Sequence, residues 1–397
     1  MHDLLLTGGR LIDSASGLSG LFDIAVSGTR IAAIAPRIDP GRAARLLDVS
    51  GKIVVPGLID LHTHVYPGAM PGALSADEAG VNAGVTTLVD AGSAGSHTFA
   101  GFRDHVLDHC ATRVITFLNI ARTGLAYQPE IRDRVDIDVE TTISTIQQHR
   151  VQIKGVKLRA IGPAVDTLGE EIVSLAKTIA RETGCPLMVH IGEIEPDRRR
   201  TLTRVVLSTL EPGDILTHAY TPRPGALVDE KTQLLPEARD AYSRGVVFDV
   251  AHGVRNFSVD IARRLLDEGL KPHTISTDMA VRPRRGPAYS LTETMSKFLA
   301  LGLSLEQVIE MATSMPAKAL GMANEIGSLQ VNRSADISVL DVLDGSWEFV
   351  DSTGAKFHGR TALTPVIAVR AGKIVPPDWG PHPWGWAPAK AEGSGAW

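Results

Sequence analysis

The sequence has few cysteines and few aromatic residues, and neither charge is in strong excess. Only Cys110 and Cys185 are cysteines among 397 residues, too few for a disulfide framework in a chain of this size. The 40 basic residues against 45 acidic residues give a net charge of −5, which argues against nucleic acid as a partner. No apolar run approaches the roughly 20 residues of a membrane-spanning helix, and no basic segment with a long apolar core opens the chain. We therefore expect a cytoplasmic protein that binds no membrane.

The composition is that of a globular protein with a large core, since 44% of the residues are hydrophobic and 21% are charged. Short apolar and β-branched runs recur at intervals of roughly 30 residues, the length of a βα unit. The stretches between them have helical spacing; Ile172, Ala176 and Ile179 share one face of a helix predicted to end before Gly184. The pattern predicts an α/β fold, a distorted (β/α)8 TIM barrel over residues 57–326, with strands at 58–62, 86–90, 114–118, 155–158, 187–190, 215–218, 246–250 and 274–278.

The two ends of the chain have a different pattern. Residues 1–56 and 327–375 carry alternating apolar segments separated by glycine and aspartate, which is typical of hairpins. Because neither end can enclose a core alone, we predict that they pack together as a small β-sandwich domain beside the barrel. The last stretch, 376–397, is rich in proline, glycine and tryptophan and is predicted to be a flexible tail; docking of its aromatic residues onto the protein or a neighbouring subunit is the alternative.

Histidine and aspartate residues lie at the carboxyl ends of several predicted strands. His62 and His64 point to the same side of the first strand because side chains alternate along a strand. Three further strands end at His190, His218 and Asp278. Each residue taken alone is more typical of a hydrogen-bonded core or rim position. Together, at the end of the strands where barrels gather their catalytic residues, they form the set of nitrogen and oxygen donors that a zinc-like ion prefers.

Lys157 ends the fourth predicted strand. An ammonium group beside bound cations would be an unpaired like charge, which is costly unless the amine is neutralised or modified. Reaction with carbon dioxide would convert the amine into a carbamate, an anionic ligand able to bridge two metal ions. Lys154 lies on the opposite face of the strand and is the weaker candidate.

These residues carry a resemblance to a known family. The runs Val55–His64, Gly155–Arg159, Met188–His190, Thr217–His218 and Ser276–Asp278 resemble the metal-site motifs of the amidohydrolase superfamily, in its binuclear branch with a lysine carbamate. The likeness extends from about Leu4 to Val375. Within that branch, Val89–Gly95, His190–Glu193 and Thr294–Gly302 are similar to the dihydroorotase-like deacetylases, a subgroup associated with acetyl esters of α-hydroxy acids.

The resemblance implies a set of ligands and a reaction. It implies that one divalent ion is held by His62, His64 and Asp278, the other by His190 and His218, and that carbamylated Lys157 and a hydroxide bridge them. Two cations, zinc by preference, would activate the bridging hydroxide and polarise a carbonyl, and Asp278 as catalytic residue would pass its proton to the leaving group. We therefore expect a hydrolase that cleaves the amide or ester bond of a small acylated carboxylic acid, an N-acyl amino acid or an O-acetyl hydroxy acid.

Arginines are expected to hold the carboxylate of such an anionic substrate. Arg159 follows the candidate carbamate on the same strand face, while Arg223, Arg255 and the run Arg282–Arg285 fall in predicted loops on the active face. A guanidinium can fork onto a carboxylate, but surface arginines are common. Arg159 is therefore the first choice.

Two further residues, His252 and Tyr289, are predicted to contact the substrate. His252 follows the seventh strand, where a structural hydrogen bond is the alternative, and Tyr289 follows the eighth, where simple packing is the alternative. A homo-oligomer is expected.

Two other functions stay open. Glu193, in His190-Ile191-Gly192-Glu193, resembles the proton-handling glutamate of mononuclear deaminases, which generally lack the lysine of the fourth strand. Lys157 thus favours hydrolysis over a nucleobase deaminase, and ring opening of a cyclic amide in the manner of dihydroorotase belongs to the same alternative. A non-catalytic barrel, acting as a binding or assembly subunit, is the second alternative; retired relatives typically lose ligands, whereas all six positions are filled here.

Overall fold

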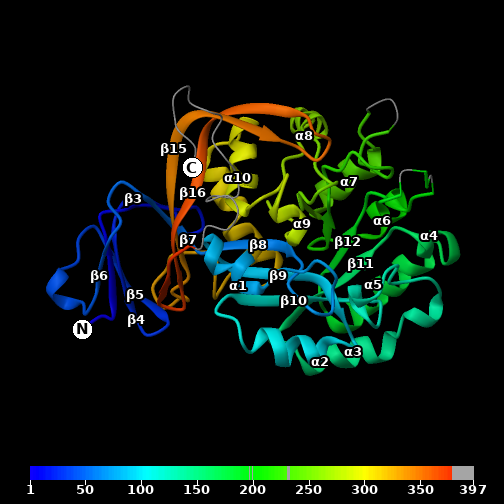
Figure 1. Ribbon diagram of the computed structural model, residues 1–397, viewed down its shortest axis with the longest axis horizontal. Helices are drawn as coiled ribbons and strands as arrows, with labels where there is room; N and C mark the ends of the chain where they lie inside the picture. Colours follow the sequence, from blue (N-terminus) through cyan, green and yellow to red (C-terminus); the bar gives the residue numbers. More distant parts are fainter. Residues whose placement is uncertain (196, 199, 230–232, 378–397) are drawn as a thin grey trace.

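The computed structural model describes residues 1–195, 197–198, 200–229 and 233–377. Its largest feature is a parallel sheet that curves into a barrel surrounded by helices (Figure 1). Neighbouring strands follow the order β14, β13, β12, β11, β10, β9, β8. Their bounds are β8 (Leu58–Thr63), β9 (Val85–Gly95), β10 (Arg113–Asn119), β11 (Ile153–Arg159), β12 (Leu187–His190), β13 (Ile215–Thr217) and β14 (Val247–Asp249). The predicted TIM-barrel architecture is confirmed, and these strands match the first seven that the sequence predicts.

The eighth predicted strand, over 274–278, is wrong as a strand. The segment is extended and bridges both neighbours, with Thr274 opposite Asp249 of β14 and Met279 opposite Thr63 of β8, but it forms no ladder. Its Asp278 has a φ of 53°, in the left-handed region that interrupts a regular strand. The barrel is therefore nearly closed, and residues 274–279 seal the gap through single bridges.

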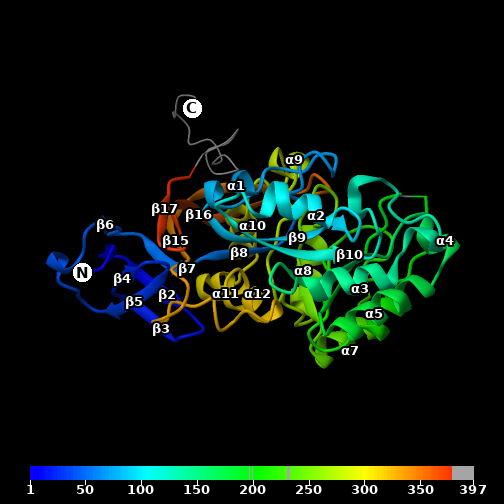
Figure 2. The ribbon, with the colours of Figure 1, turned by 90° about the horizontal axis from the view of Figure 1, so that it is seen from below.

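Helices connect the strands and cover the outside of the barrel (Figures 1 and 2). In α5, a buried face that includes Ile172, Ala176 and Ile179 packs inward, and Gly184 ends the helix with a φ of 65°, as predicted. None of the described helices is long and apolar enough to cross a membrane. The helices are α1 (Ala76–Ala79), α2 (Phe99–Phe102), α3 (Val139–Gln148), α4 (Pro163–Thr167), α5 (Glu171–Thr183), α6 (Thr203–Thr209), α7 (Pro236–Arg244), α8 (Val259–Asp267), α9 (Val281–Arg284), α10 (Leu291–Ala300), α11 (Leu305–Met311) and α12 (Ser314–Ala319).

Two further sheets are built from the ends of the chain. One has the order β5, β4, β1, β6, and the other the order β17, β16, β15, β7, β2, β3, so the second sheet joins N-terminal and C-terminal strands. A shared apolar cluster contains Leu6 and Ile24 of the first sheet and Val54 and Val339 of the second. The strands are β1 (Leu4–Thr7), β2 (Arg10–Asp13), β3 (Leu18–Leu21), β4 (Asp23–Ser27), β5 (Arg30–Ala35), β6 (Leu46–Asp48), β7 (Ile53–Pro56), β15 (Ile337–Val350), β16 (Lys356–Arg370) and β17 (Lys373–Val375).

The hairpin of β15 and β16 reaches from this second sheet to the barrel (Figure 1). Near its tip, Phe349 and Phe357 belong to the same core as the barrel residues, and Leu363 donates its backbone N–H to Ser296 of α10 at 2.9 Å. The sandwich segment 327–375 stays a prediction, and the distal half of this hairpin lies against the barrel. Residues 378–397 of the predicted tail lie outside the described residues.

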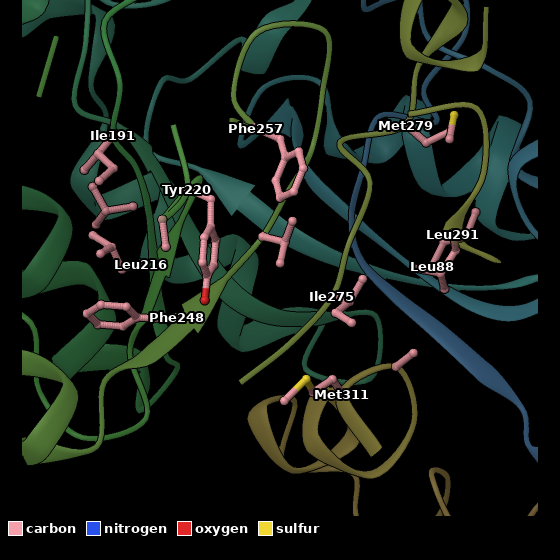
Figure 3. Close-up of a cluster of buried hydrophobic side chains, with 14 of the residues drawn as sticks. Leu88, Ile191, Leu216, Tyr220, Phe248, Phe257, Ile275, Met279, Leu291 and Met311 are labelled. Atoms are coloured by element: carbon pink, nitrogen blue, oxygen red, sulfur yellow. The ribbon is translucent and has the colours of Figure 1, made fainter. Parts of the chain in front are cut away.

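The main core lies between the barrel strands and the helices around them. Figure 3 shows part of it, where Tyr220 stands among Leu216, Phe248 and Phe257. The buried Tyr220 hydroxyl donates to the carbonyl of Leu270 at 3.1 Å, so this hydroxyl keeps a hydrogen-bond partner inside the core. A second cluster takes residues from β8, β9, β10, β12, β13 and α12 and includes Met188.

Candidate metal centre and active-site cavity

The six residues predicted as metal ligands meet at the carboxyl ends of the barrel strands. β8, β11 and β12 position His62, Lys157 and His190; His64 and His218 directly follow β8 and β13, and Asp278 lies in the bridging segment 274–279. All but Asp278 are buried, and the Asp278 side chain is 20% exposed.

One group consists of His62, His64 and Asp278. Their candidate ligand atoms all lie within 4.8 Å of one another. The Asp278 Oδ1 lies 3.5 Å from the Nε2 of His62 and 3.2 Å from the Nε2 of His64. Two imidazoles and a carboxylate converging in this way form a donor set suited to one divalent ion.

A second group consists of His190 and His218. The Nε2 of His218 lies 2.9 Å from the Nδ1 of His190, so the two ring nitrogens face one another. The His190 Nε2 is buried and has no hydrogen-bond partner among the described residues. The ring centroids of His62 and His218 lie 4.9 Å apart, so the two groups of residues are neighbours.

Hydrogen bonds fix the orientation of three of these rings through the nitrogen that faces away from the centre. The Nδ1 of His62 lies 2.8 Å from the Thr217 hydroxyl, and that of His64 lies 3.0 Å from the Ser93 hydroxyl. The Nδ1 of His218 lies 2.7 Å from the carbonyl of Ala251. Such outer contacts are what metal-bound histidines use to select a tautomer and hold the ring. Neither Thr217 nor Ser93 was recognised from the sequence, because a hydroxyl residue near a strand end carries no special signal.

A buried carboxylate, Asp249, supports this outer layer. It accepts hydrogen bonds from Thr217 at 2.8 Å, Thr274 at 2.7 Å and Ser276 at 2.7 Å. The Thr217 hydroxyl therefore donates to Asp249 and is available to accept from His62, so the His62 tautomer with a free Nε2 is selected.

Lys157 is completely buried within the barrel. Its Nζ lies 3.3 Å from the Nε2 of His62 and 3.3 Å from the Sδ of Met188, and no carboxylate of the described residues forms an ion pair with it. Burial lowers the pKa of Lys157 to about 7. Gly92 allows this placement, since a Cβ there would stand 2.7 Å from the Cγ of the lysine.

Three histidines of the site, His62, His190 and His218, are held in the neutral form that binds metals. Burial lowers the pKa of His62 and of His190 well below the ordinary value, and it lowers the pKa of His218 to about 4. Burial by itself would raise the pKa of Asp278, but the hydrogen bond with His64 and the neighbouring His218 outweigh burial and lower the pKa. The carboxylate is therefore ionised.

Strained backbone conformations occur at the same place. His218 and Asp278 have φ values of 65° and 53°, which cost about 1 kcal/mol or more each for residues that are not glycine. Gly253 faces Asp278, because a Cβ on it would meet the Oδ2 of the aspartate at 2.5 Å. The strained residues are thus two candidate ligands whose side chains converge on one point.

A cavity of about 240 Å³ opens onto the centre. His64, His190 and Asp278 form part of its wall. Apolar side chains and three arginines form much of the rest; they are Met70, Pro71, Leu125, Ile194, Val254, Ala280 and Pro283, with Arg159, Arg255 and Arg282. A small molecule seated here would touch both the candidate metal centre and the guanidinium groups.

The structure brings only one of the three predicted substrate residues to this cavity. Arg159 lines it and donates through Nη1 to the Oε2 of Glu130 at 3.0 Å. His252 is fully buried instead, stacked on Phe257 at 4.6 Å. Its Nε2 lies 3.0 Å from the Nζ of Lys297 and its Nδ1 2.8 Å from the carbonyl of Gly253, the structural hydrogen bonds named as the alternative.

Tyr289, the third of these residues, is half-buried beside the main core rather than among the residues that line the cavity. Glu193 is also tied into the fold. Its carboxylate accepts the backbone N–H groups of Gly162 at 2.8 Å and Glu195 at 3.0 Å, and it lines a neighbouring cavity of about 310 Å³ that shares Arg159 with the first.

The donor set fits divalent metal ions. Imidazoles with outer hydrogen bonds and an ionised carboxylate converge here. Beside them, the buried His190 Nε2 has no hydrogen-bond partner and the Lys157 amine has no ion pair among the described residues, and together these features are characteristic of a metal centre. His62, His64 and Asp278 would hold one ion, and His190 and His218 lie next to them.

Comparison with known proteins agrees with this arrangement. Residues 53–375 match the amidohydrolase family. A deacetylase of Agrobacterium fabrum is 33% identical over 384 residues, which cover 94% of this chain and 93% of that protein. Among solved structures, an adenine deaminase superposes with a TM-score of 0.87 at 30% identity, covering 95% of this chain and 100% of that one. A dihydroorotase superposes with a TM-score of 0.85 at 31% identity, covering 95% and 98%.

The family match spans most of the chain, and the relatives include hydrolases and a deaminase of the same fold, which supports an enzyme of the hydrolase type. The chain belongs to the amidohydrolase family.

Proposed function

We propose that this enzyme removes the acyl group from a small acylated carboxylic acid, by hydrolysis of an amide or an ester bond. The observation that carries the proposal is the 240 Å³ cavity, whose lining includes both candidate metal ligands and arginines. A substrate with a scissile carbonyl at the metal centre and a carboxylate at the guanidinium groups satisfies both kinds of lining residue. The name of the Agrobacterium fabrum relative, a deacetylase, supports acetyl as the acyl group.

We further propose two divalent ions, zinc by preference, held by His62, His64 and Asp278 and by His190 and His218. Bound ions of this kind polarise a carbonyl and lower the pKa of water towards neutrality. Lys157 would join as a carbamate: its neutral amine attacks the carbon of carbon dioxide, a C–N bond forms, and one proton leaves the nitrogen. The supporting observation is a fully buried lysine next to His62 that forms no ion pair within the described part of the chain.

The chain's own residues divide the remaining work. Asp278, ionised and at the edge of the cavity, is the proton acceptor of the site and can return that proton to the departing amine or alkoxide. Thr217 holds His62 in the tautomer with a free Nε2, and Ser93 fixes the orientation of the His64 ring. The apolar wall of the cavity excludes water around the bound acyl group.

A turnover screen tests the proposal. The metal-reconstituted enzyme is incubated with N-acetyl amino acids and O-acetyl hydroxy acids, and acetate release is measured, with Asp278→Asn as the inactive control. Release of acetate that requires Asp278 would support the proposal. Ammonia from adenine or cytosine, or opening of dihydropyrimidine rings, with no acetate release would instead favour the activities named for the two solved neighbours.

Metal analysis separates both enzymatic readings from a non-catalytic barrel. We expect close to two ions per chain after reconstitution with zinc. A chain that retains no ion would contradict both catalytic readings.

A further inference from the structure

The arginines around the cavity are not equivalent in charge. Arg159 is neutralised by Glu130, since their side chains form an ion pair at 3.0 Å that is about nine-tenths buried. Arg255 and Arg282 line the same cavity, and neither forms an ion pair or a side-chain hydrogen bond with any residue that the structure describes. The cavity therefore presents two uncompensated guanidinium groups.

A third positive charge lies nearby. Burial and the proximity of Arg282 and Arg223 all lower the pKa of the Arg255 guanidinium. A guanidinium stays protonated in spite of such a shift, so the fold holds like charges close together at a cost in stability. Elsewhere in the protein, Arg113 and Arg370, which also lie close together, share Asp336 as a counter-charge. A bound anion would offset this repulsion, and a single negative charge would leave one guanidinium of the cavity uncompensated.

The two guanidinium groups come from different elements, Arg255 from the loop after β14 and Arg282 from α9. Two guanidinium groups held by different elements suit two separate carboxylates better than one compact anion. The cavity is small at about 240 Å³, and its apolar lining suits a short aliphatic spacer between those groups. These features disfavour a phosphorylated sugar or a nucleotide.

We propose that the acid released by this enzyme is a compact dicarboxylate, with Arg255 and Arg282 each binding one carboxylate. The inference rests on the proposed deacylase function and narrows its substrate class from acylated carboxylic acids in general to acylated dicarboxylic acids.

Isosteric substrate pairs test it, because an amide replaces a carboxylate with almost no change in volume. N-acetylglutamate is compared with N-acetylglutamine, and O-acetylmalate with its monoamide; N-acetylphosphoserine serves as the phosphate probe. We expect kcat/KM to be at least about tenfold higher for the diacid of each pair, mainly through KM, as is typical of one charge-assisted hydrogen bond. The preference should shrink as ionic strength rises from about 0.1 M to about 1 M. Equal kcat/KM within both pairs, or a preference for the phosphate probe, would overturn the inference.

Variants locate the effect. Arg255→Gln and Arg282→Gln should each lose most of the preference for the diacid over the monoamide, because a single guanidinium remains to bind a carboxylate; the ratio of the two kcat/KM values is the readout. Arg285→Gln is the matched control, since Arg285 is an exposed arginine of the same segment that does not line the cavity. A control variant that loses the preference as fully as the other two would also contradict the assignment.

A binding measurement keeps the inference separate from the proposed function. If no acylated acid is hydrolysed, the deacylase proposal fails, and calorimetry with glutarate and its monoamide decides the inference alone. Tighter binding of glutarate that is lost in the Arg255→Gln and Arg282→Gln double variant supports a dicarboxylate site. Equal binding of the two probes overturns it.

Discussion

A buried lysine in α10, Lys297, is expected to control the stability of the loops around the cavity. Its Nζ donates to the carbonyl of Pro287 at 2.6 Å, to that of Val350 at 3.0 Å and to the Nε2 of His252 at 3.0 Å. The three partners belong to the segment after α9, to the end of β15 and to the loop after β14. One ammonium group therefore ties together two cavity loops and the long hairpin.

The charge of Lys297 is balanced within the same helix by Glu293, one turn earlier, with 3.6 Å between Nζ and Oε1. Both side chains are almost fully buried, and the Oε2 of Glu293 has no hydrogen-bond partner in the described part of the chain. Removing one member of such a pair leaves an uncompensated buried charge, which costs about 3–5 kcal/mol. We therefore expect Lys297→Met to lower the free energy of unfolding by about 4 kcal/mol.

The Lys297→Met and Glu293→Met double variant separates the charge from the packing. It leaves no unpaired carboxylate, so we expect it to regain at least about 2 kcal/mol relative to Lys297→Met alone. Urea unfolding of metal-free protein, followed by circular dichroism, measures the free energy of unfolding of the wild type, of Lys297→Met and of the double variant without a contribution from metal binding. A double variant no more stable than Lys297→Met would refute the reasoning, because the carboxylate would then not be the source of the loss.

The stability that Lys297→Met loses relative to the wild type should depend on pH with a defined sign; this loss is called the deficit below. Burial raises the pKa of Glu293 well above its ordinary value, and without Lys297 the carboxyl group can escape the penalty only by staying protonated. A raised pKa favours the folded state at low pH and loses that contribution as pH rises. The deficit of Lys297→Met should therefore grow between about pH 5 and pH 8. Tyr289 and His252, which also face this pair, stay neutral in that range, since burial raises the pKa of Tyr289 and lowers that of His252.

A second buried lysine provides the control for function. Lys177 of α5 is 5% exposed and pairs with Asp214 at 2.5 Å and Glu211 at 2.8 Å, away from the residues that line the active-site cavity. Lys177→Met should cost stability in the same range but leave KM unchanged. Lys297→Met should also raise KM, because Pro287 and His252 belong to segments that carry cavity residues.

Four further outcomes are expected. Lys157→Ala should lose turnover that short carboxylic acids partly restore, because a free carboxylate can replace a carbamate; unimpaired turnover without an additive would contradict the carbamate. Treatment with a chelator should abolish hydrolysis, and zinc should restore it at about two equivalents; full activity in the chelated protein would argue against a metal-dependent reaction. Thr217→Val should weaken metal affinity about 10- to 100-fold, measured by competition with a chromogenic chelator, since His62 loses its outer hydrogen bond; unchanged affinity would remove Thr217 from the site. Burial raises the pKa of Cys110 to about 11, so the native protein should resist alkylation of this thiol at pH 8 and react rapidly only after unfolding; fast labelling of native protein would show that the thiol is accessible.

The barrel was predictable because its strands are continuous apolar runs with charged or polar residues at their ends. The β12 strand begins and ends at the residues that the sequence indicates, Leu187 and His190. The run 274–278 has the same composition, but it forms no β-ladder. Its serine and threonine side chains instead donate hydrogen bonds to Asp249 and Asp60. Periodicity cannot distinguish these cases, because the competing hydrogen bonds come from residues far along the chain.

The position of the C-terminal hairpin was not predictable for a similar reason. Alternation in residues 335–375 correctly indicates strands, but it does not say what each face of a strand covers. The partners of the hairpin tip are distant: Asp351 accepts the backbone N–H of Val259, and Ser352 bonds to Phe257, over separations above 90 residues. The tip is thereby fixed beside the loop after β14, so a segment assigned from sequence to the sandwich also supports the active-site region.

The substrate residues show a more general limit, because charge compensation depends on tertiary structure. From the sequence, Arg159 is the strongest candidate for binding a carboxylate, since it lies two residues after Lys157 on one strand face. The fold pairs it with Glu130, from the loop between β10 and α3, and leaves Arg255 and Arg282 without counter-charges in the same cavity. The arginine that the strand pattern places closest to the metal centre is thus already neutralised, whereas Arg255, in the loop after β14, and Arg282, in α9, still carry uncompensated charge. An anionic substrate is attracted by net charge and not by proximity alone, so Arg255 and Arg282, and not Arg159, should set which acids the enzyme accepts.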